Sequence, residues 1–118
     1  MRVEQTDFVS VPTRDVARAV AWYRDVFGLP VSEHSPGEVE TPNVTLSFWD
    51  AAADGEALQP NTAGIALRVD DVRAAVEEAR AGGAEVIGIH DSGVCHMGFV
   101  KDPDGNVVIL HRRYAPRG

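Results

Sequence analysis

The sequence predicts an α+β fold of two βαβββ modules, which form a curved mixed sheet around a cup with the helices outside. The first observation is an internal repeat, because DVARAV at 15–20 recurs as DVRAAV at 71–76, about half of the 118 residues later. The second is that a strand-like segment precedes each copy and about three more follow it. A module of this size cannot bury its own sheet face, so the two copies should pack together. The concave inner face is then the natural place for a ligand.

Composition sets the broad class. The hydrophobic fraction of 44% and the charged fraction of 25% are typical of a globular domain, and a net charge of −7 argues against a nucleic-acid partner. No apolar run approaches the roughly 20 residues that cross a bilayer, and MRVEQTDF has no apolar core of a signal peptide. The single cysteine, Cys95, fits a reducing compartment. We therefore expect one cytoplasmic domain, residues 1–118, without a nucleic-acid or membrane partner.

The first module is predicted over about residues 5–50. Residues 8–11 alternate as a half-buried strand does, and Asp15 is a suitable N-cap for a helix over 16–27. Gly28 ends that helix and Pro30 cannot continue it. Strands are expected at 29–34, 38–41 and 44–49. Residues 51–62, rich in Ala, Gly, Asp and Pro, are predicted as a linker.

The second module is predicted over about residues 63–114. A strand at 63–69 leads to the N-cap Asp71 and a helix over 72–81, which Gly82-Gly83 ends. A strand at 84–90 and a turn at 91–93 follow. Residues 94–100 and 107–111 form the last hairpin, because DPDGN at 102–106 is a turn sequence and VVILH after it is β-branched.

Two segments of this pattern match a known family. WYRDVFGLP at 22–30 ends the first helix, and FVKDPDGN at 99–106 lies near the C-terminus. Together with the paired βαβββ modules, they resemble the vicinal oxygen chelate superfamily, which includes glyoxalase I, extradiol dioxygenases, fosfomycin-resistance enzymes and bleomycin-resistance proteins. The resemblance spans essentially the whole chain. It implies a homodimer with cup-shaped pockets.

The resemblance also implies where a catalytic metal would be held. Enzymes of the family bind a divalent ion through four side chains on the inner strands, and the matching positions here are Phe8, Thr45, Gly64 and Ile109. A catalytic metal needs about three imidazole, carboxylate or thiolate ligands. Phe, Gly and Ile side chains cannot ligate, and Thr is a poor ligand. We therefore predict no metal and no other cofactor.

The predicted ligand-binding residues lie on the same strand faces as the four metal-ligand positions. His111 is two residues after Ile109 and shares its face of the strand, where an imidazole can act as a general base or a hydrogen-bond donor. It is the one candidate catalytic residue. In the family, the face with Phe99 lines the pocket. The predicted lining consists of Phe8, Ser10, Thr45, Trp49, Met97, Phe99, Ile109 and His111.

The register of the last hairpin leaves two arrangements open. One places Cys95, Met97 and Phe99 on the pocket face; a symmetric turn would instead place His96 opposite His111. Glu33, His34, Glu38 and Glu40 cluster near a turn, either as a solvated face or as a rim that favours a cationic ligand.

The function predicted from these observations is the binding of a small organic molecule in a mostly apolar cup, as in the bleomycin-resistance type. The alternative is a lyase, isomerase or dioxygenase of the same superfamily. It would use His111 as acid/base, or an atypical metal site from His96, His111 and Glu40 or His34. A third possibility is a regulatory module that acts through its dimer surface.

Overall fold

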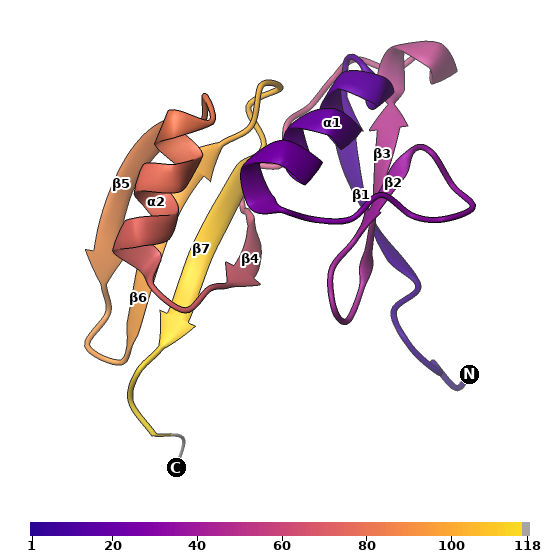
Figure 1. Cartoon of the computed structure of the whole chain (residues 1–118). Coiled ribbons are helices and arrows are strands. Elements are labelled where there is room, and N and C mark those ends of the chain that lie inside the picture. Colours follow the sequence, from indigo (N-terminus) through magenta and orange to yellow (C-terminus); the bar gives the residue numbers. More distant parts are fainter. Residues whose placement is uncertain (117–118) are drawn as a thin grey trace. The chain divides into compact units, whose positions relative to one another are not determined.

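The computed structural model describes residues 1–116, so residues 117 and 118 of the predicted domain lie outside the described part. The chain divides into two compact units, one of residues Met1–Gln59 and one that begins at Pro60. The first unit contains β1 (Phe8–Thr13), α1 (Val16–Phe27), β2 (Glu38–Glu40), β3 (Thr45–Asp50) and a 3-10 turn, η1 (Ala51–Asp54). The second contains β4 (Ile65–Arg68), α2 (Val72–Ala81), β5 (Glu85–Asp91), β6 (Cys95–Lys101) and β7 (Val107–Arg113) (Figure 1).

The two sheets have equivalent topologies. The first has the order β1-β3-β2 and the second the order β4-β7-β6-β5. In each, the strand before the helix is parallel to the last strand of the unit, and the other contacts are antiparallel. The predicted α+β fold with two βαβββ modules is confirmed.

One predicted strand is reduced almost to nothing. Of residues 29–34, only Val31 pairs, in a single bridge to Val39. Pro30 has no N–H to donate and contributes only its carbonyl, which accepts from the Glu40 N–H at 2.8 Å. The chain then turns away, with the Glu38 N–H donating to Ser35 at 3.2 Å. The first sheet is therefore narrower than the second.

Both helices have the predicted bounds and caps. The Asp15 carboxylate accepts from the Arg18 N–H, and the Asp71 carboxylate from the Ala74 N–H, each at 3.1 Å. α1 ends at Gly28, whose φ of 68° is the left-handed conformation that glycine adopts without strain.

In the first unit, α1 covers one face of the sheet. Tyr23 is almost completely buried, and its ring centroid lies 4.8 Å from that of Phe48 on β3. Val11 and Leu46 are buried on the same face. Because side chains alternate along a strand, the intervening residues point to the face that α1 does not cover.

In the second unit, α2 packs on β6 at a glycine. A Cβ atom built on Gly98 would lie 2.4 Å from Cγ2 of Val76, so the helix approaches the strand more closely than any side chain would allow. Val100, Val108 and Leu110 are buried on this face. We call the face of each sheet opposite its helix the open face.

No helix within residues 1–116 is both long enough and apolar enough to cross a membrane.

Candidate functional site

The open face of the first unit carries all four lining residues predicted there. The parallel register pairs Phe8 with Thr45, Ser10 with Ser47, and Pro12 with Trp49. Since paired residues share a face, Phe8, Ser10, Thr45 and Trp49 all point away from α1. Phe8 is 55% exposed and Trp49 40%, and the Trp49 indole N–H donates to the Asp54 carboxylate. The face therefore combines aromatic surface with hydroxyl groups.

The acidic residues of β2 join this face. Glu38 pairs with Ser47 and Glu40 with Thr45. The Glu40 carboxylate accepts from the Thr45 hydroxyl and, at 2.9 Å, from the Ser32 hydroxyl. Glu40 therefore lies within the sheet, already engaged by two donors, and separate from the exposed Glu33 and His34 with which the sequence grouped it.

A shallow hollow of about 470 Å³ lies beside the start of β1, within the first unit. It is lined by Gln5, Thr6, Val9, Asn43 and Val44. None of these is a predicted lining residue.

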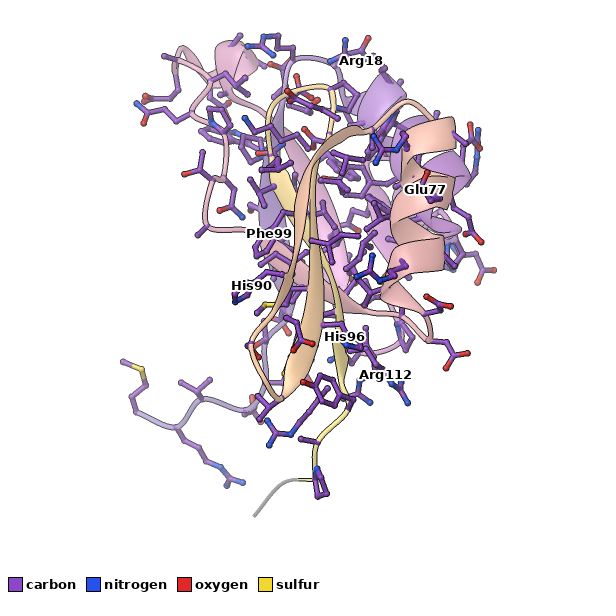
Figure 2. All side chains as sticks on the ribbon, turned by 90° about the vertical axis from the view of Figure 1, so that its left-hand side faces the viewer. Arg18, Glu77, His90, His96, Phe99 and Arg112 are labelled. Carbon is purple, nitrogen blue, oxygen red and sulfur yellow. The ribbon has the colours of Figure 1, made fainter. Side chains whose placement is uncertain are left out.

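The open face of the second unit carries the other four. Met97 pairs with His111 and Phe99 with Ile109 in the antiparallel register of β6 and β7. Gly98, between Met97 and Phe99, faces α2, so all four side chains point the other way. Figure 2 shows Phe99, with His90 of β5, on the side of the sheet away from α2.

The register decides between the two arrangements that the sequence left open. His96 pairs with Arg112, not with His111, so the symmetric-turn alternative is wrong. The reason is a five-residue loop, 102–106, whose ends join through the Asp102 N–H and the Asn106 carbonyl at 2.9 Å. Cys95 consequently shares the open face with Met97, and His96 lies on the opposite face (Figure 2).

The four positions that correspond to the family's metal ligands form two neighbouring pairs. Phe8 and Thr45 are register partners in the first unit. In the second, a Cβ on Gly64 would lie 3.0 Å from the Ile109 side chain, and Gly64 has a φ of 98°. A larger residue at position 64 would therefore be strained and crowded. Phenyl, alkyl and glycine groups offer no ligand atom and do not fit a divalent ion.

The atypical ligand set is not assembled in the second unit either. His96 and His111 are on neighbouring strands but on opposite faces of the sheet. Within residues 1–116, no three His, Cys, Asp or Glu side chains gather in a group that could hold a metal ion.

Sequence reasoning missed the basic residues of the open face, which are Arg68, His90, Lys101 and Arg113. Arg68 of β4 pairs with His111, and His90 of β5 pairs with Met97. The available signal was alternation along the strand at 63–69, where Arg68 has the same parity as Gly64. This alternation could not place Arg68 beside His111 without knowing which strand pairs with β7.

A polar cluster lies at the turn between β5 and β6. The Asp91 carboxylate accepts from the Gly93 N–H and from the Tyr114 hydroxyl, both at 2.8 Å, and His96 Nε2 lies 3.5 Å from it. The Gly93 and Tyr114 hydrogen bonds, with lesser contributions from His96 and His90, hold the pKa of Asp91 below its ordinary value. The hydrogen bond to Asp91 in turn raises the pKa of the Tyr114 hydroxyl. The cluster ties Tyr114 to the turn.

Replacing Tyr114 with phenylalanine is expected to raise the pKa of Asp91 toward its ordinary value, with the Gly93 N–H still keeping it lowered. A carboxyl whose folded pKa is lowered adds stability above its unfolded pKa and loses it as the pH falls through the folded pKa. In Y114F this loss should therefore be complete at a higher pH. Carboxyl NMR titration measures the pKa of Asp91 in both proteins. Asp25, whose pKa is lowered by Arg24, is the internal control. An unchanged Asp91 titration would contradict the assignment.

The sequence of residues 5–110 matches the model of the Glyoxalase/Bleomycin resistance protein/Dioxygenase superfamily. Among curated proteins, no sequence matches this chain significantly.

Solved structures with the same fold include proteins of different functions. A glyoxalase/bleomycin resistance protein/dioxygenase family enzyme from Burkholderia phytofirmans PsJN is 23% identical, with a TM-score of 0.79 over 92% of this chain and 100% of that one. TnmS3, an antibiotic binding protein from Streptomyces sp. CB03234, is 24% identical, with a TM-score of 0.79 over 97% and 99%. Lactoylglutathione lyase from Agrobacterium tumefaciens is 20% identical, with a TM-score of 0.75 over 94% and 95%.

At these identities the structural likeness establishes the fold alone, whereas the family model matches most of the sequence directly. The paired βαβ topology of the two units is consistent with both comparisons. This chain belongs to the glyoxalase/bleomycin resistance protein/dioxygenase superfamily.

Proposed function

We propose that this chain binds a small organic molecule on the apolar open faces of its sheets, without the divalent metal that enzymes of the superfamily use. The observation that carries the proposal is the identity of the residues at the four metal-ligand positions. The side chains of Phe8 and Ile109 and the glycine at position 64 offer no ligand atom. Apolar groups therefore occupy the positions at which related enzymes hold the metal.

Exposed aromatic surface supports a binding role. Phe8 and Trp49 lie on one open face, and Met97, Phe99 and Ile109 form a continuous patch on the other. Apolar residues gathered on one face, with a few hydroxyl and imidazole groups among them, are typical of a small-molecule site. The structural neighbour TnmS3 is an antibiotic binding protein, which supports a binding role for a protein of this fold.

Binding to the open face of the second unit is tested with the neutral fluorophore N-phenyl-1-naphthylamine. We expect saturable binding that weakens about tenfold in I109S, because a buried apolar contact is replaced by a hydroxyl. I89S is the matched control, since Ile89 pairs with Gly98 on the opposite face and is 41% exposed. Fluorescence titration measures both. Equal losses in the two variants would contradict a site on the open face.

Metal independence is tested by thermal unfolding after removal of metals with a chelator. Adding Ni, Zn, Mn, Fe or Mg ions is expected to leave the melting temperature unchanged, whereas an ion that binds only the folded state would raise it further as its concentration exceeds its dissociation constant. Metal analysis of the untagged protein accompanies the measurement. A stoichiometric ion that survives purification would overturn the metal-free proposal.

The rival function is a lyase, isomerase or dioxygenase with His111 as acid/base. It is favoured by one observation: the His111 side chain lies on the open face beside Met97, where a ligand would be bound. H111A separates the two functions. Under the binding proposal, affinity for N-phenyl-1-naphthylamine stays within a few fold; under the enzyme proposal, turnover of any substrate found is abolished.

We further propose a homodimer in the cytoplasm. The exposed Phe8 and Trp49 support association with a second copy, and the single, free Cys95 fits a reducing compartment. Light scattering of the purified protein determines the number of copies.

A further inference from the structure

We propose that the open face of the second unit holds an anionic group of the ligand, such as a carboxylate, sulfonate or phosphate, between Arg68 and His111. The proposal rests on the proposed function, because it assigns a chemical class to the molecule bound there. The class is a planar apolar body with one anionic substituent.

The first observation is a row of side chains that crosses the whole sheet. Arg68 pairs with His111, His111 with Met97, and Met97 with His90, so the four strands each contribute one residue. Neighbouring strands lie about 4.8 Å apart, so Arg68 and His111 stand side by side on the open face. The guanidinium and the imidazole N–H can therefore donate to the same anion.

The second observation is that these donors are not used by the protein. Within residues 1–116, neither the Arg68 side chain nor the His111 side chain has a hydrogen bond or ion-pair partner, although Asp70 follows Arg68 closely in sequence. By contrast, Arg24 and Arg80 on the helices pair with Asp25 and Glu77.

The third observation is the distribution of charge. Residues 1–59 contain four basic and ten acidic residues, a net charge of −6, whereas residues 60–118 contain seven and eight, a net charge of −1. Among the strand residues on the open face of the second unit, the acidic one is Glu85. It pairs with Lys101, which is opposite Val107, four residues along β7 from His111. The row of Arg68, His111, Met97 and His90 therefore contains no acidic residue.

The fourth observation is the adjoining row. Ala66 pairs with Ile109, Ile109 with Phe99, and Phe99 with Gly88. Phe99 and Ile109 form an apolar floor, and the small residues at either end leave space for a flat ring. This row lies two residues, or about 7 Å, from the Arg68 row. Figure 2 shows Phe99 and His90 on the same side of the sheet, as this arrangement requires.

A cationic ligand, considered from the acidic residues of the first unit, is less well matched. The Glu40 carboxylate already accepts from the Ser32 and Thr45 hydroxyls. Arg68 has no such partner among the described residues, so an added anion satisfies a charge that the fold leaves unpaired.

Two fluorophores that differ in one group test the proposal. 8-Anilino-1-naphthalenesulfonate is N-phenyl-1-naphthylamine with a sulfonate added, so the ratio of their affinities reports the contribution of the anion. In R68Q we expect the sulfonate probe to bind about ten times more weakly, and the neutral probe to change less than twofold. H111A should weaken the sulfonate probe by about threefold. Added salt should reduce its affinity more in the wild type than in R68Q.

R112Q is the matched control. Arg112 lies next to His111 on β7 but pairs with His96 on the opposite face, so its loss removes the same net charge without touching the row. An equal loss of sulfonate binding in R112Q and R68Q would mean that only net charge matters, and would overturn the proposal. An unchanged affinity ratio in R68Q would do the same. If the wild type does not bind the neutral probe at all, it is the proposed binding function that fails.

Discussion

G98A is expected to lower the free energy of unfolding by about 2 to 3 kcal/mol, although it adds a single methyl group. The new Cβ would lie 2.4 Å from Cγ2 of Val76 and 3.3 Å from Cγ1 of Val72. Val76 is completely buried, so neither α2 nor its side chains have free space into which to move. Denaturant unfolding of both proteins measures the loss.

Two further variants make the result specific to helix packing. Gly88, in the neighbouring strand β5, has no atom within 4 Å of its Cβ position, so G88A should be neutral or slightly stabilising. V76A should partly compensate for G98A, and the double variant should be less destabilised than the sum of the two single ones. Strict additivity would show that the close approach at Gly98 does not limit the packing.

The helices of this fold could be predicted to the residue because local signals determine their ends. Asp15 and Asp71 accept from the N–H three residues ahead, and Gly28 takes a positive φ. These interactions lie within one turn of the helix, so they can be recognised without knowing the tertiary structure.

The strands were harder to predict than the helices, because their extent and register depend on the strands beside them. The segment 29–34 has a strand-like composition, but the Pro30 nitrogen cannot donate, and only Val31 forms a bridge. The last hairpin was located correctly, but its register was not determined. A loop one residue shorter than the symmetric turn, 102–106 instead of 101–106, changes the partner of His111 from His96 to Met97. Such a shift exchanges the two faces of a strand and cannot be read from alternation alone.

The face on which each candidate residue lies could be predicted along a single strand, but the residues that meet across neighbouring strands could not. Phe8, Thr45, Phe99 and Ile109 were placed by the resemblance to the superfamily, and alternation along single strands placed Ser10 and His111 beside them. The row from Arg68 to His90 involves four strands, and its members are distant in sequence. Only the sheet order β4-β7-β6-β5 brings them together.

D102A is expected to have the largest effect on stability, a loss of about 3 to 5 kcal/mol. The Asp102 carboxylate is buried and accepts from the N–H groups of Asp104 and Asn106, both at 2.9 Å, and from the Asn106 side-chain amide at 2.8 Å. Alanine would leave three buried donors without this acceptor. Denaturant unfolding measures the loss.

The effect should extend beyond the turn because Asn106 connects it to the segment before β4. The Asn106 side-chain oxygen accepts from the Asn61 N–H at 2.8 Å, and the Asn61 carbonyl accepts from the Val107 N–H at 2.8 Å. Asn61 also accepts from the N–H groups of Ala63 and Gly64. Asp102 therefore supports both the loop of the hairpin and the start of the parallel strand that carries Arg68.

A matched control and a milder variant keep this prediction testable if D102A does not fold. D71A removes an aspartate that caps an exposed helix end by accepting from the Ala74 N–H, and it should cost only about 1 kcal/mol. D102N retains an oxygen for the two backbone donors but turns an amide toward the Asn106 amide. Its loss of stability should therefore lie between those of D71A and D102A. If D102N is as stable as the wild type, the buried carboxylate does not hold the turn. Because the same loop places Met97 beside His111, D102N should also bind N-phenyl-1-naphthylamine more weakly, whereas D71A should not.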